Sequence, residues 1–144
     1  MSIEDIEEIR RARSKYYMSV DARRWDEAVD IYSDQASVDF AGVWKGQTKK
    51  GIKKVLLDMV GAGTSATFHC AYLPIVEVDG DTATAVGYLE THSLPVGAEE
   101  TYSQIGRIED QYIKEKGKWK LKRAVYTTLV QSRSTGQLIN KISP

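Results

Sequence analysis

The two histidines of the chain lie in one segment, Thr67–Ser93, which the sequence predicts to be a β-hairpin. Asp79-Gly80 separates two β-rich runs, and this dipeptide is a strong signal for a two-residue hairpin turn. With that turn, His69 lies opposite Glu90, and His92 lies one diagonal step away on the same face of the sheet. The pattern therefore predicts two imidazole rings at the open end of one hairpin.

Pro74 leaves an alternative register open. A bulge at this proline would shift the pairing by one residue and turn the side chains of the first strand to the other face. In the unshifted register, Tyr88 shares the face of His69. The opposite face then carries an apolar set that predicts burial against another subunit: Phe68, Tyr72, Val76 and Val78.

Size and composition fit a single globular domain. The 144 residues include equal numbers of basic and acidic residues, so net charge favours no polyanionic partner. Cys70 is the only cysteine, which excludes an internal disulfide and suits a reducing compartment. No apolar run of membrane-spanning length and no signal peptide is present, so we expect a cytoplasmic protein with no membrane partner.

The sequence predicts no metal or cofactor and no nucleic-acid partner. Two histidines and scattered acids give no spaced metal motif, and no glycine-rich phosphate loop is present. Several lysines flank the predicted turn at Lys116-Gly117, and we interpret them as a solvated edge rather than a nucleic-acid surface.

Three helices are predicted in the first half of the chain. Apolar residues at three- and four-residue steps indicate an amphipathic first helix that begins after Ser2: Ile6, Ile9, Ala12, Tyr16 and Val20. Its charged residues are expected on the solvent side: Glu7, Glu8, Arg10, Arg11 and Arg13. A short helix around residues 25–32 and a third around 52–59 follow, the third ending at Gly61-Ala62-Gly63.

The rest of the chain is predicted to be mostly strand. After a strand at 36–40 and a short strand near 43–45, the hairpin is followed by long strands at 101–113 and 119–130. Strict alternation in the last strand places Trp119, Leu121 and Arg123 on one face and Ala124 and Tyr126 on the other. Helices first and antiparallel strands later indicate an α+β fold, whose long, curved strands form a cone with a small-molecule pocket in its hollow.

Several patterns in order resemble the SnoaL-like branch of the nuclear transport factor 2 superfamily. They are residues 6–28, the run Tyr32–Phe40, His69 followed by 77–84, and residues 112–121, so the resemblance covers about residues 3–131. It implies a cone-shaped α+β barrel with a strongly curved, mixed, largely antiparallel sheet and three helices over its concave side. It also implies one domain at residues 1–131, a homodimer or homotrimer, and a tail at 132–144 that docks on a neighbouring subunit through Leu138, Ile139 and Ile142, or frays.

The motifs are most similar to those of scytalone dehydratase, bile acid 7α-dehydratase and hexachlorocyclohexane dehydrochlorinase, which are cofactor-free lyases with an Asp–His pair in the cone. By this resemblance the aspartate matches Asp21, the histidine matches His69 and the helix tyrosine of the dehydratases matches Tyr16. His92 is a possible counterpart of a second histidine in scytalone dehydratase, although the loop between the two histidines has a different length. The pocket-closing arginine of some members has three candidates: Arg107, Arg123 and Arg133.

These residue types suit an elimination reaction. Histidine supplies a base near neutral pH, and a carboxylate on its far nitrogen fixes the tautomer and stabilises the imidazolium. A phenol can donate a hydrogen bond to a developing enolate or a leaving hydroxyl; the resemblance favours Tyr16, whereas helix spacing favours Tyr17, four residues before Asp21. The residues expected to bind substrate are Tyr17, Trp44, Tyr88, His92, Arg107 and Tyr126.

We therefore expect a cofactor-free, dehydratase-like lyase that acts on a small apolar cyclic substrate. A polyketide cyclase or double-bond isomerase that uses the same base is the first alternative. A non-catalytic ligand-binding domain is the second, in which Asp21 is only a cap between helices and Tyr16 only packs in the core.

Overall fold

The structure, a computed structural model, describes residues 2–135. Its elements in chain order are α1 (Ile3–Asp21), α2 (Trp25–Val29), β1 (Tyr32–Phe40), β2 (Trp44–Gln47), α3 (Thr48–Leu56), the π-helix η1 (Leu57–Ala62), β3 (Thr64–Ala71), β4 (Ile75–Asp79), β5 (Thr82–Pro95), β6 (Glu100–Glu115) and β7 (Lys118–Thr135).

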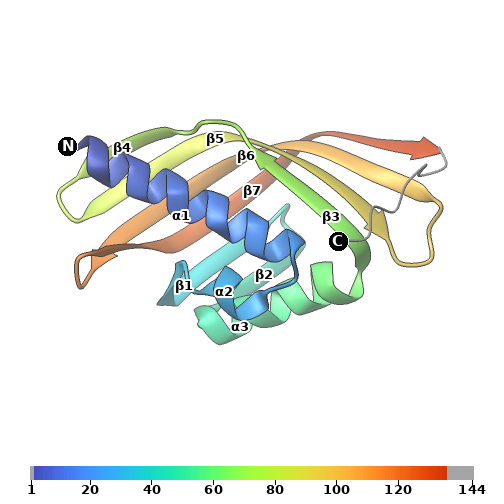
Figure 1. Cartoon of the computed structure of the whole chain (residues 1–144), viewed down its shortest axis with the longest axis horizontal. Helices are drawn as coiled ribbons and strands as arrows, with labels where there is room; N and C mark the ends of the chain where they lie inside the picture. Colours follow the sequence, from blue (N-terminus) through green and yellow to red (C-terminus); the bar gives the residue numbers. More distant parts are fainter. Residues whose placement is uncertain (1, 136–144) are drawn as a thin grey trace.

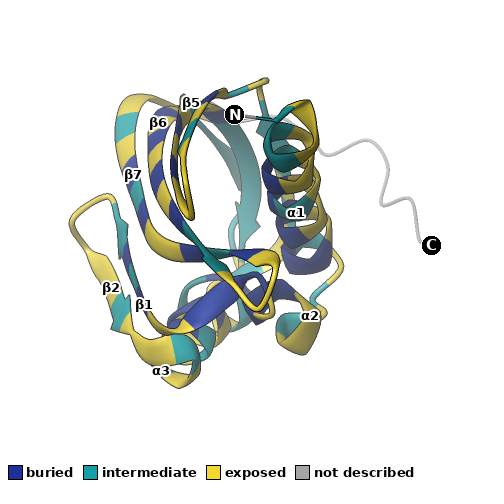
Figure 2. Ribbon diagram, turned by 90° about the vertical axis from the view of Figure 1, so that its left-hand side faces the viewer, coloured by how far each residue is buried: buried dark blue, intermediate teal, exposed yellow. Residues whose placement is uncertain are grey.

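The strands form one mixed sheet that curls around the first helix (Figure 1). Seven strands are ordered β2-β1-β7-β6-β5-β3, with β4 also paired to β5; β1 and β7 are parallel and the other pairings are antiparallel. Figure 2 shows the long strands bending toward α1, with α2 and α3 beneath. The predicted α+β cone with a curved mixed sheet is confirmed.

Helix α1 supplies one wall of the core. The Ser2 side chain caps it by accepting a hydrogen bond from the Asp5 backbone N–H at 3.1 Å. Its inward side carries buried Ile9 and Val20, as the periodicity predicts. The placement of Arg13 on the solvent side is wrong, because this residue is only 5% exposed. It lies seven residues before Val20, a spacing of two helical turns, so it belongs to the buried stripe.

The start of α1 is tied to the far end of the sheet through Asp5. Its Oδ1 accepts hydrogen bonds from Lys114 Nζ and Trp119 Nε1, both at 2.8 Å, and the nearby Glu8 accepts one from the Trp119 backbone N–H at 3.1 Å. These hydrogen bonds from Lys114, Trp119 and Ser2 hold the pKa of Asp5 well below its ordinary value. The charged carboxylate therefore fixes the helix across the β6–β7 hairpin.

The predicted hairpin is interrupted at Pro74, and its register differs from the unshifted prediction. Asp79 pairs with Thr82 in β4–β5, whereas His69 pairs with Thr91 in β3–β5. Proline cannot donate to the ladder, so β3 ends before it and β4 begins after it in a new register. His92 pairs with Phe68 and lies on the outer face, so the prediction that both histidines share one face is wrong.

This interruption also divides the predicted apolar outer face. Phe68 and Tyr72 lie on the outer face and are 56% and 50% exposed, whereas Val76 is buried and Val78 packs against the core. The alternation of inward and outward side chains reverses between β3 and β4, so Val76 and Val78 turn inward. The homodimer or homotrimer expected from this face stays a prediction.

A bulge changes the facing in β7 as well. Leu121 pairs with Tyr112 while Arg123 pairs with Gln111, so Lys122 is the extra residue. Beyond it the inward residues are Ala124 and Tyr126, not the Arg123 series that strict alternation predicts. The shift carries the Tyr126 ring to the inner face.

Tyr126 then lies directly over Gly106 of β6. A Cβ atom at Gly106 would come within 2.2 Å of the Tyr126 ring, so only glycine fits there.

The last strand is longer than predicted. It extends to Thr135, so the first residues of the predicted tail at 132–144 belong to β7. The docking segment with Leu138, Ile139 and Ile142 lies outside the described residues. No helix in residues 2–135 has the length and apolar character needed to cross a bilayer.

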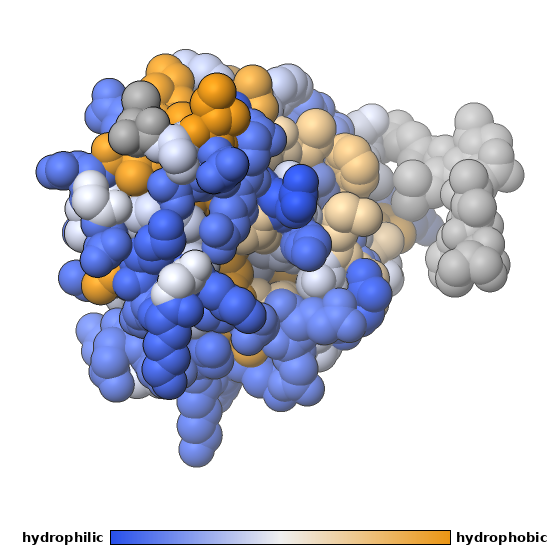
Figure 3. Space-filling view, turned by 60° about the vertical axis from the view of Figure 1, so that its left-hand side comes forward, coloured by the Kyte–Doolittle hydropathy of each residue, from blue (hydrophilic) through white to orange (hydrophobic). Residues whose placement is uncertain are grey.

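The surface near the β6–β7 turn is hydrophilic. Lys116 and Lys118 are exposed at this turn. Figure 3 shows a largely hydrophilic face on this side of the molecule, with hydrophobic residues gathered toward its upper edge. Exposed lysines beside a hairpin turn agree with a solvated edge.

The Asp5 network predicts a pH-dependent contribution to stability. Because folding lowers the pKa of Asp5, its contribution is complete above the ordinary value of 3.8 and is lost as pH falls from there toward the folded value. We expect Asp5→Asn to lower the melting temperature by a few degrees at neutral pH, and the difference from wild type to shrink below about pH 4.

Glu4→Gln is the matched control, because it removes the same charge from the same helical turn at an exposed residue. An equal effect of both substitutions would show that only the helix dipole is involved. Thermal melts followed by circular dichroism across pH make the comparison.

Candidate active site

The Asp21 carboxylate joins the end of α1 to β3. Its Oδ1 lies 2.6 Å from His69 Nδ1 and accepts a hydrogen bond from Thr67 Oγ1 at 2.9 Å, while Oδ2 accepts one from the His69 backbone N–H at 2.9 Å. The side chains of His69 and Asp21 are 15% and 23% exposed. Because a carboxylate accepts hydrogen bonds, Nδ1 of His69 carries a proton and Nε2 has the free lone pair.

Arg23 holds the chain segments around this pair. It follows α1 at a φ of 58° and donates hydrogen bonds from Nη1 to the carbonyl oxygens of Val60 and Gly61 at 3.1 and 3.2 Å, and from Nη2 to that of Thr64 at 2.7 Å. These carbonyls belong to the end of η1 and the start of β3. The residue thus links the loop after Asp21 to the strand that carries His69.

The His69 ring lies in the wall of a cavity of about 630 Å³. It stacks on the Tyr17 ring, with the ring centroids 5.6 Å apart and the planes 12° apart. The cavity is bounded by α1, the β1–β2 hairpin, the α3–η1 segment and the inner face of β3, β5, β6 and β7. A cavity of this size can enclose a small ring system.

Two tyrosines of α1 line the cavity beside this ring. Tyr16 and Tyr17 are 6% and 5% exposed, and their rings meet edge to face at 5.2 Å. Burial raises the pKa of both phenols, and the positive charge of Arg13 opposes this only in part. Both hydroxyls therefore keep their protons at neutral pH and can donate hydrogen bonds.

A buried ion pair supports the tyrosines. Arg13 Nε lies 3.0 Å from Asp110 Oδ2, and the guanidinium carbon lies 4.8 Å from the centroids of both the Tyr16 and Tyr17 rings. Burial disfavours the charged guanidinium and is the largest single effect. Asp110 and the nearby tyrosines Tyr17, Tyr32 and Tyr112 together outweigh it, so the pKa of Arg13 lies well above its ordinary value. The cation stays charged beneath the aromatic end of the cavity.

The other predicted site residues fall into two groups. Trp44, 38% exposed, and Tyr126, 9% exposed, line the cavity. Tyr88 and Arg107 are a cross-strand pair on the outer face, so the prediction that they contact substrate is wrong. For Tyr88 the prediction followed from the unshifted register, which placed it on the face of His69, whereas for Arg107 it followed from the family resemblance.

His92 borders the cavity, but its ring points to the outer face. Its Nε2 lies 2.8 Å from Glu90 Oε1, and its Nδ1 lies 2.9 Å from Ser103 Oγ. Of the alternatives to Arg107, Arg123 is exposed on the outer face, and Arg133 lies 4.7 Å from the Tyr102 ring centroid. None of these three arginines is among the described residues that line the cavity.

Sequence reasoning missed several residues around the site. Thr67 lies two residues before His69 on the same strand face, and this alternation could have identified it as a neighbour of the pair. The spacing of Arg13 within the apolar stripe was a signal for its burial. No local pattern pointed to the hydrogen bonds from Arg23 to the carbonyl oxygens of Val60, Gly61 and Thr64, which we call the Arg23 clamp. These acceptors lie 37 to 41 residues away in the sequence.

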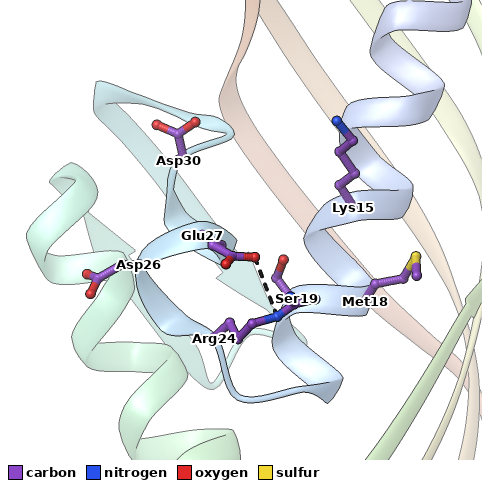
Figure 4. Close-up of a pocket in the computed structure, with 7 residues that line it drawn as sticks. All are labelled: Lys15, Met18, Ser19, Arg24, Asp26, Glu27 and Asp30. Carbon is purple, nitrogen blue, oxygen red and sulfur yellow. Dashed lines mark ion pairs between the residues drawn. The ribbon is translucent and has the colours of Figure 1, made fainter.

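A second hollow, between α1 and α2, has a different character (Figure 4). Arg24 Nε lies 3.4 Å from Glu27 Oε2 there, and the side chains of Asp26 and Asp30 are largely exposed. The hollow contains no histidine, and its charges are solvated. Across the described residues, no group of three His, Cys, Asp or Glu side chains is arranged to hold a metal ion.

The buried Arg13–Asp110 pair makes a testable prediction for stability. Asp110→Asn removes the carboxylate and leaves the guanidinium buried without its counter-charge, so we expect a loss of about 3–5 kcal/mol in the free energy of unfolding. The double variant Arg13→Met/Asp110→Leu removes both charges and should recover most of that loss. Urea unfolding measures both; losses that simply add would contradict the pairing.

The Arg23 clamp makes a second prediction. Arg23→Ala should cost about 1–3 kcal/mol of unfolding free energy, since three partly buried carbonyl oxygens lose their donor. It should also weaken or broaden the NMR signal of the His69 Nδ1–H proton. Arg24→Ala is the neighbouring control: this side chain is 55% exposed and should change stability by less than about 0.5 kcal/mol. Equal effects of the two variants would argue against a clamp.

Comparison with solved structures gives the same fold at low sequence identity. A provisionally named scytalone dehydratase from Novosphingobium aromaticivorans has a TM-score of 0.84 and 18% identity, covering 99% of this chain and 95% of its own. A type 2 hexachlorocyclohexane dehydrochlorinase has a TM-score of 0.86 and 15% identity, covering 94% and 93%. A provisionally named aromatic ring hydroxylase from Novosphingobium aromaticivorans has a TM-score of 0.84 and 21% identity, covering 93% and 96%.

Sequence comparison identifies the family. No curated protein matches the chain. The family model described as the SnoaL-like domain matches residues 1–125, which is most of the chain and includes Asp21 and His69. The chain therefore belongs to the SnoaL-like domain family.

Proposed function

We propose that the protein is a cofactor-free lyase that removes water, or a similar small leaving group, from a cyclic substrate in the cone cavity. The observation that carries this proposal is the His69–Asp21 pair, in which a carboxylate 2.6 Å from Nδ1 leaves Nε2 as the basic atom in the cavity wall.

The reaction begins with proton removal from carbon. His69 Nε2 takes the proton. The electron pair of the C–H bond then forms a carbon–carbon double bond in the substrate ring as the carbon–oxygen bond of the leaving hydroxyl breaks. The proton on the imidazolium passes to the departing hydroxyl, so water leaves and the histidine returns to its neutral form. Asp21 stabilises the imidazolium between these steps and keeps the ring in place.

Tyr16 and Tyr17 supply hydrogen bonds for oxygen. Both are protonated and line the cavity, so either can donate to a carbonyl oxygen that gains negative charge or to the leaving hydroxyl. Tyr17 lies against the His69 ring, whereas Tyr16 lies against the Tyr32 ring, and Arg13 contacts both. The contacts favour Tyr17 next to the base and Tyr16 farther along the same wall.

A cyclase or double-bond isomerase is the second enzymatic candidate, because the same base can return its proton to another carbon. Family membership supports it equally, since the SnoaL-like fold is shared by proteins with different activities. Product mass separates the two: it falls by one water for the lyase and is unchanged for the isomerase.

A non-catalytic binding domain would need no base beside its ligand. A plugged cone or an imidazole out of reach of the carboxylate would favour that function. The open volume of about 630 Å³ and the 2.6 Å separation support catalysis instead.

Turnover of a panel of hydroxylated cyclic ketones in D₂O, followed by mass spectrometry, tests the proposal. We expect His69→Ala and Asp21→Asn to lower kcat/KM by at least about 10³-fold. Both should stay folded at the assay temperature, with Asp21→Asn melting a few degrees lower because it weakens the contacts between α1 and β3. His92→Ala is the matched control, because its ring lies on the outer face, and it should keep full activity. Full activity in either of the first two variants would refute the mechanism.

A further inference from the structure

Four side chains with hydrogen-bonding groups form one row across the inner face of the sheet. His69 of β3 pairs with Thr91 of β5, Thr91 with Gln104 of β6, and Gln104 with Gln131 of β7. Residues paired across strands share a face, so all four lie on the side of His69. All four also line the cavity, with Gln131 exposed at its rim. The row runs from the base to the edge of the site.

The next row on the same face, two positions along each strand from the first, is polar as well. Thr67 pairs with Ser93, and Ser93 pairs with Tyr102. These three residues line the cavity too. The sheet wall therefore presents hydroxyl and amide groups over two successive rows, which can both donate and accept hydrogen bonds.

The opposite wall has the reverse character. It comes from the β1–β2 hairpin and the α3–η1 segment, and its side chains are apolar: Phe40, Val43, Trp44, Leu56, Met59 and Val60. A molecule between these walls meets hydrogen-bonding groups on one side and only apolar contacts on the other. The wholly apolar substrate expected from the sequence would leave the polar row without partners, at a cost in affinity.

The lining also lacks free charge. Among the described lining residues there is no lysine, aspartate or glutamate. The three side chains in the lining that could attract an anion are each paired already: Arg13 with Asp110, His69 with Asp21 and His92 with Glu90. A carboxylate or phosphate ligand would find no free counter-charge there.

We propose that the site takes an uncharged ring system that carries hydroxyl or carbonyl oxygens along one edge, with Gln104 as the residue that selects it. Neighbouring strands lie about 4.8 Å apart, so Gln104, two strands from His69, lies roughly 10 Å from the base. That span fits a molecule of two or three fused rings with the reacting carbon at His69 and an oxygen at the amide. The placement of the reacting carbon rests on the proposed lyase function; the selection for uncharged oxygenated rings does not.

Binding of unreactive probes tests this selection without turnover. Isothermal titration calorimetry compares 2,6-dihydroxynaphthalene, naphthalene and naphthalene-2-carboxylate on the wild-type protein. We expect the diol to bind at least about tenfold more tightly than naphthalene, as one or two hydrogen bonds allow, and the carboxylate to bind most weakly.

Gln104→Leu should bring the affinities for the diol and naphthalene to within about threefold of each other, mainly by weakening the diol. Gln111→Leu is the matched control: it is the same substitution on the same strand, but on the exposed outer face, and it should leave both affinities unchanged. Thr91→Val supplies a second variant in the row if Gln104→Leu does not fold.

Three results would overturn the proposal: equal binding of the diol and naphthalene to wild type, an unchanged preference in Gln104→Leu, or tightest binding of the carboxylate. Absence of binding by every probe at millimolar concentration also counts against it. Because no reaction is measured, inactive protein with intact diol preference would reject only the lyase, and active protein without that preference would reject only the selection.

Discussion

The arrangement of the site depends on a single carboxylate. Asp21 is the last residue of α1, and its two oxygens accept from the Thr67 hydroxyl, the His69 backbone N–H and the His69 ring. Three donors from one strand fix the carboxylate in position and orientation, and they fix the strand against the helix. The same contact that orients the His69 ring also joins the helical layer to the sheet.

Curvature of the sheet gives this contact its surroundings. The strands bend around α1 (Figure 2). Residues of their inner face line the cavity together with residues of the β1–β2 hairpin and η1. Breaks and bulges decide which side chains point into it: the break at Pro74 turns His69 inward, beside Thr91 of β5, and the bulge at Lys122 brings in Tyr126. The π-helix adds Met59 and Val60, which fits the frequent occurrence of such turns at functional sites.

The aromatic end of the cavity contains a buried charge. An unpaired guanidinium in such a place would be strongly destabilising, and the pairing of Arg13 with Asp110 avoids that cost. The ion pair is not, however, more stabilising than apolar side chains packed in the same space would be. Its consequence for the site is electrostatic. Positive charge beside Tyr16 and Tyr17 partly counters the effect of burial on their pKa values, so the phenols are better donors than burial alone would allow.

The sequence by itself determined the fold class, the order of the elements and the pairing of Asp21 with His69, because hydrophobic periodicity, turn residues and the family motif are local features of the chain. It did not determine which face many strand residues occupy, since one proline or one bulge reverses the facing of all that follows. Tyr88 was misplaced for this reason. Only the tertiary structure decided the burial of Arg13, the Arg23 clamp and the polar row from His69 to Gln131, because each joins residues far apart in sequence through the curvature and register of the sheet.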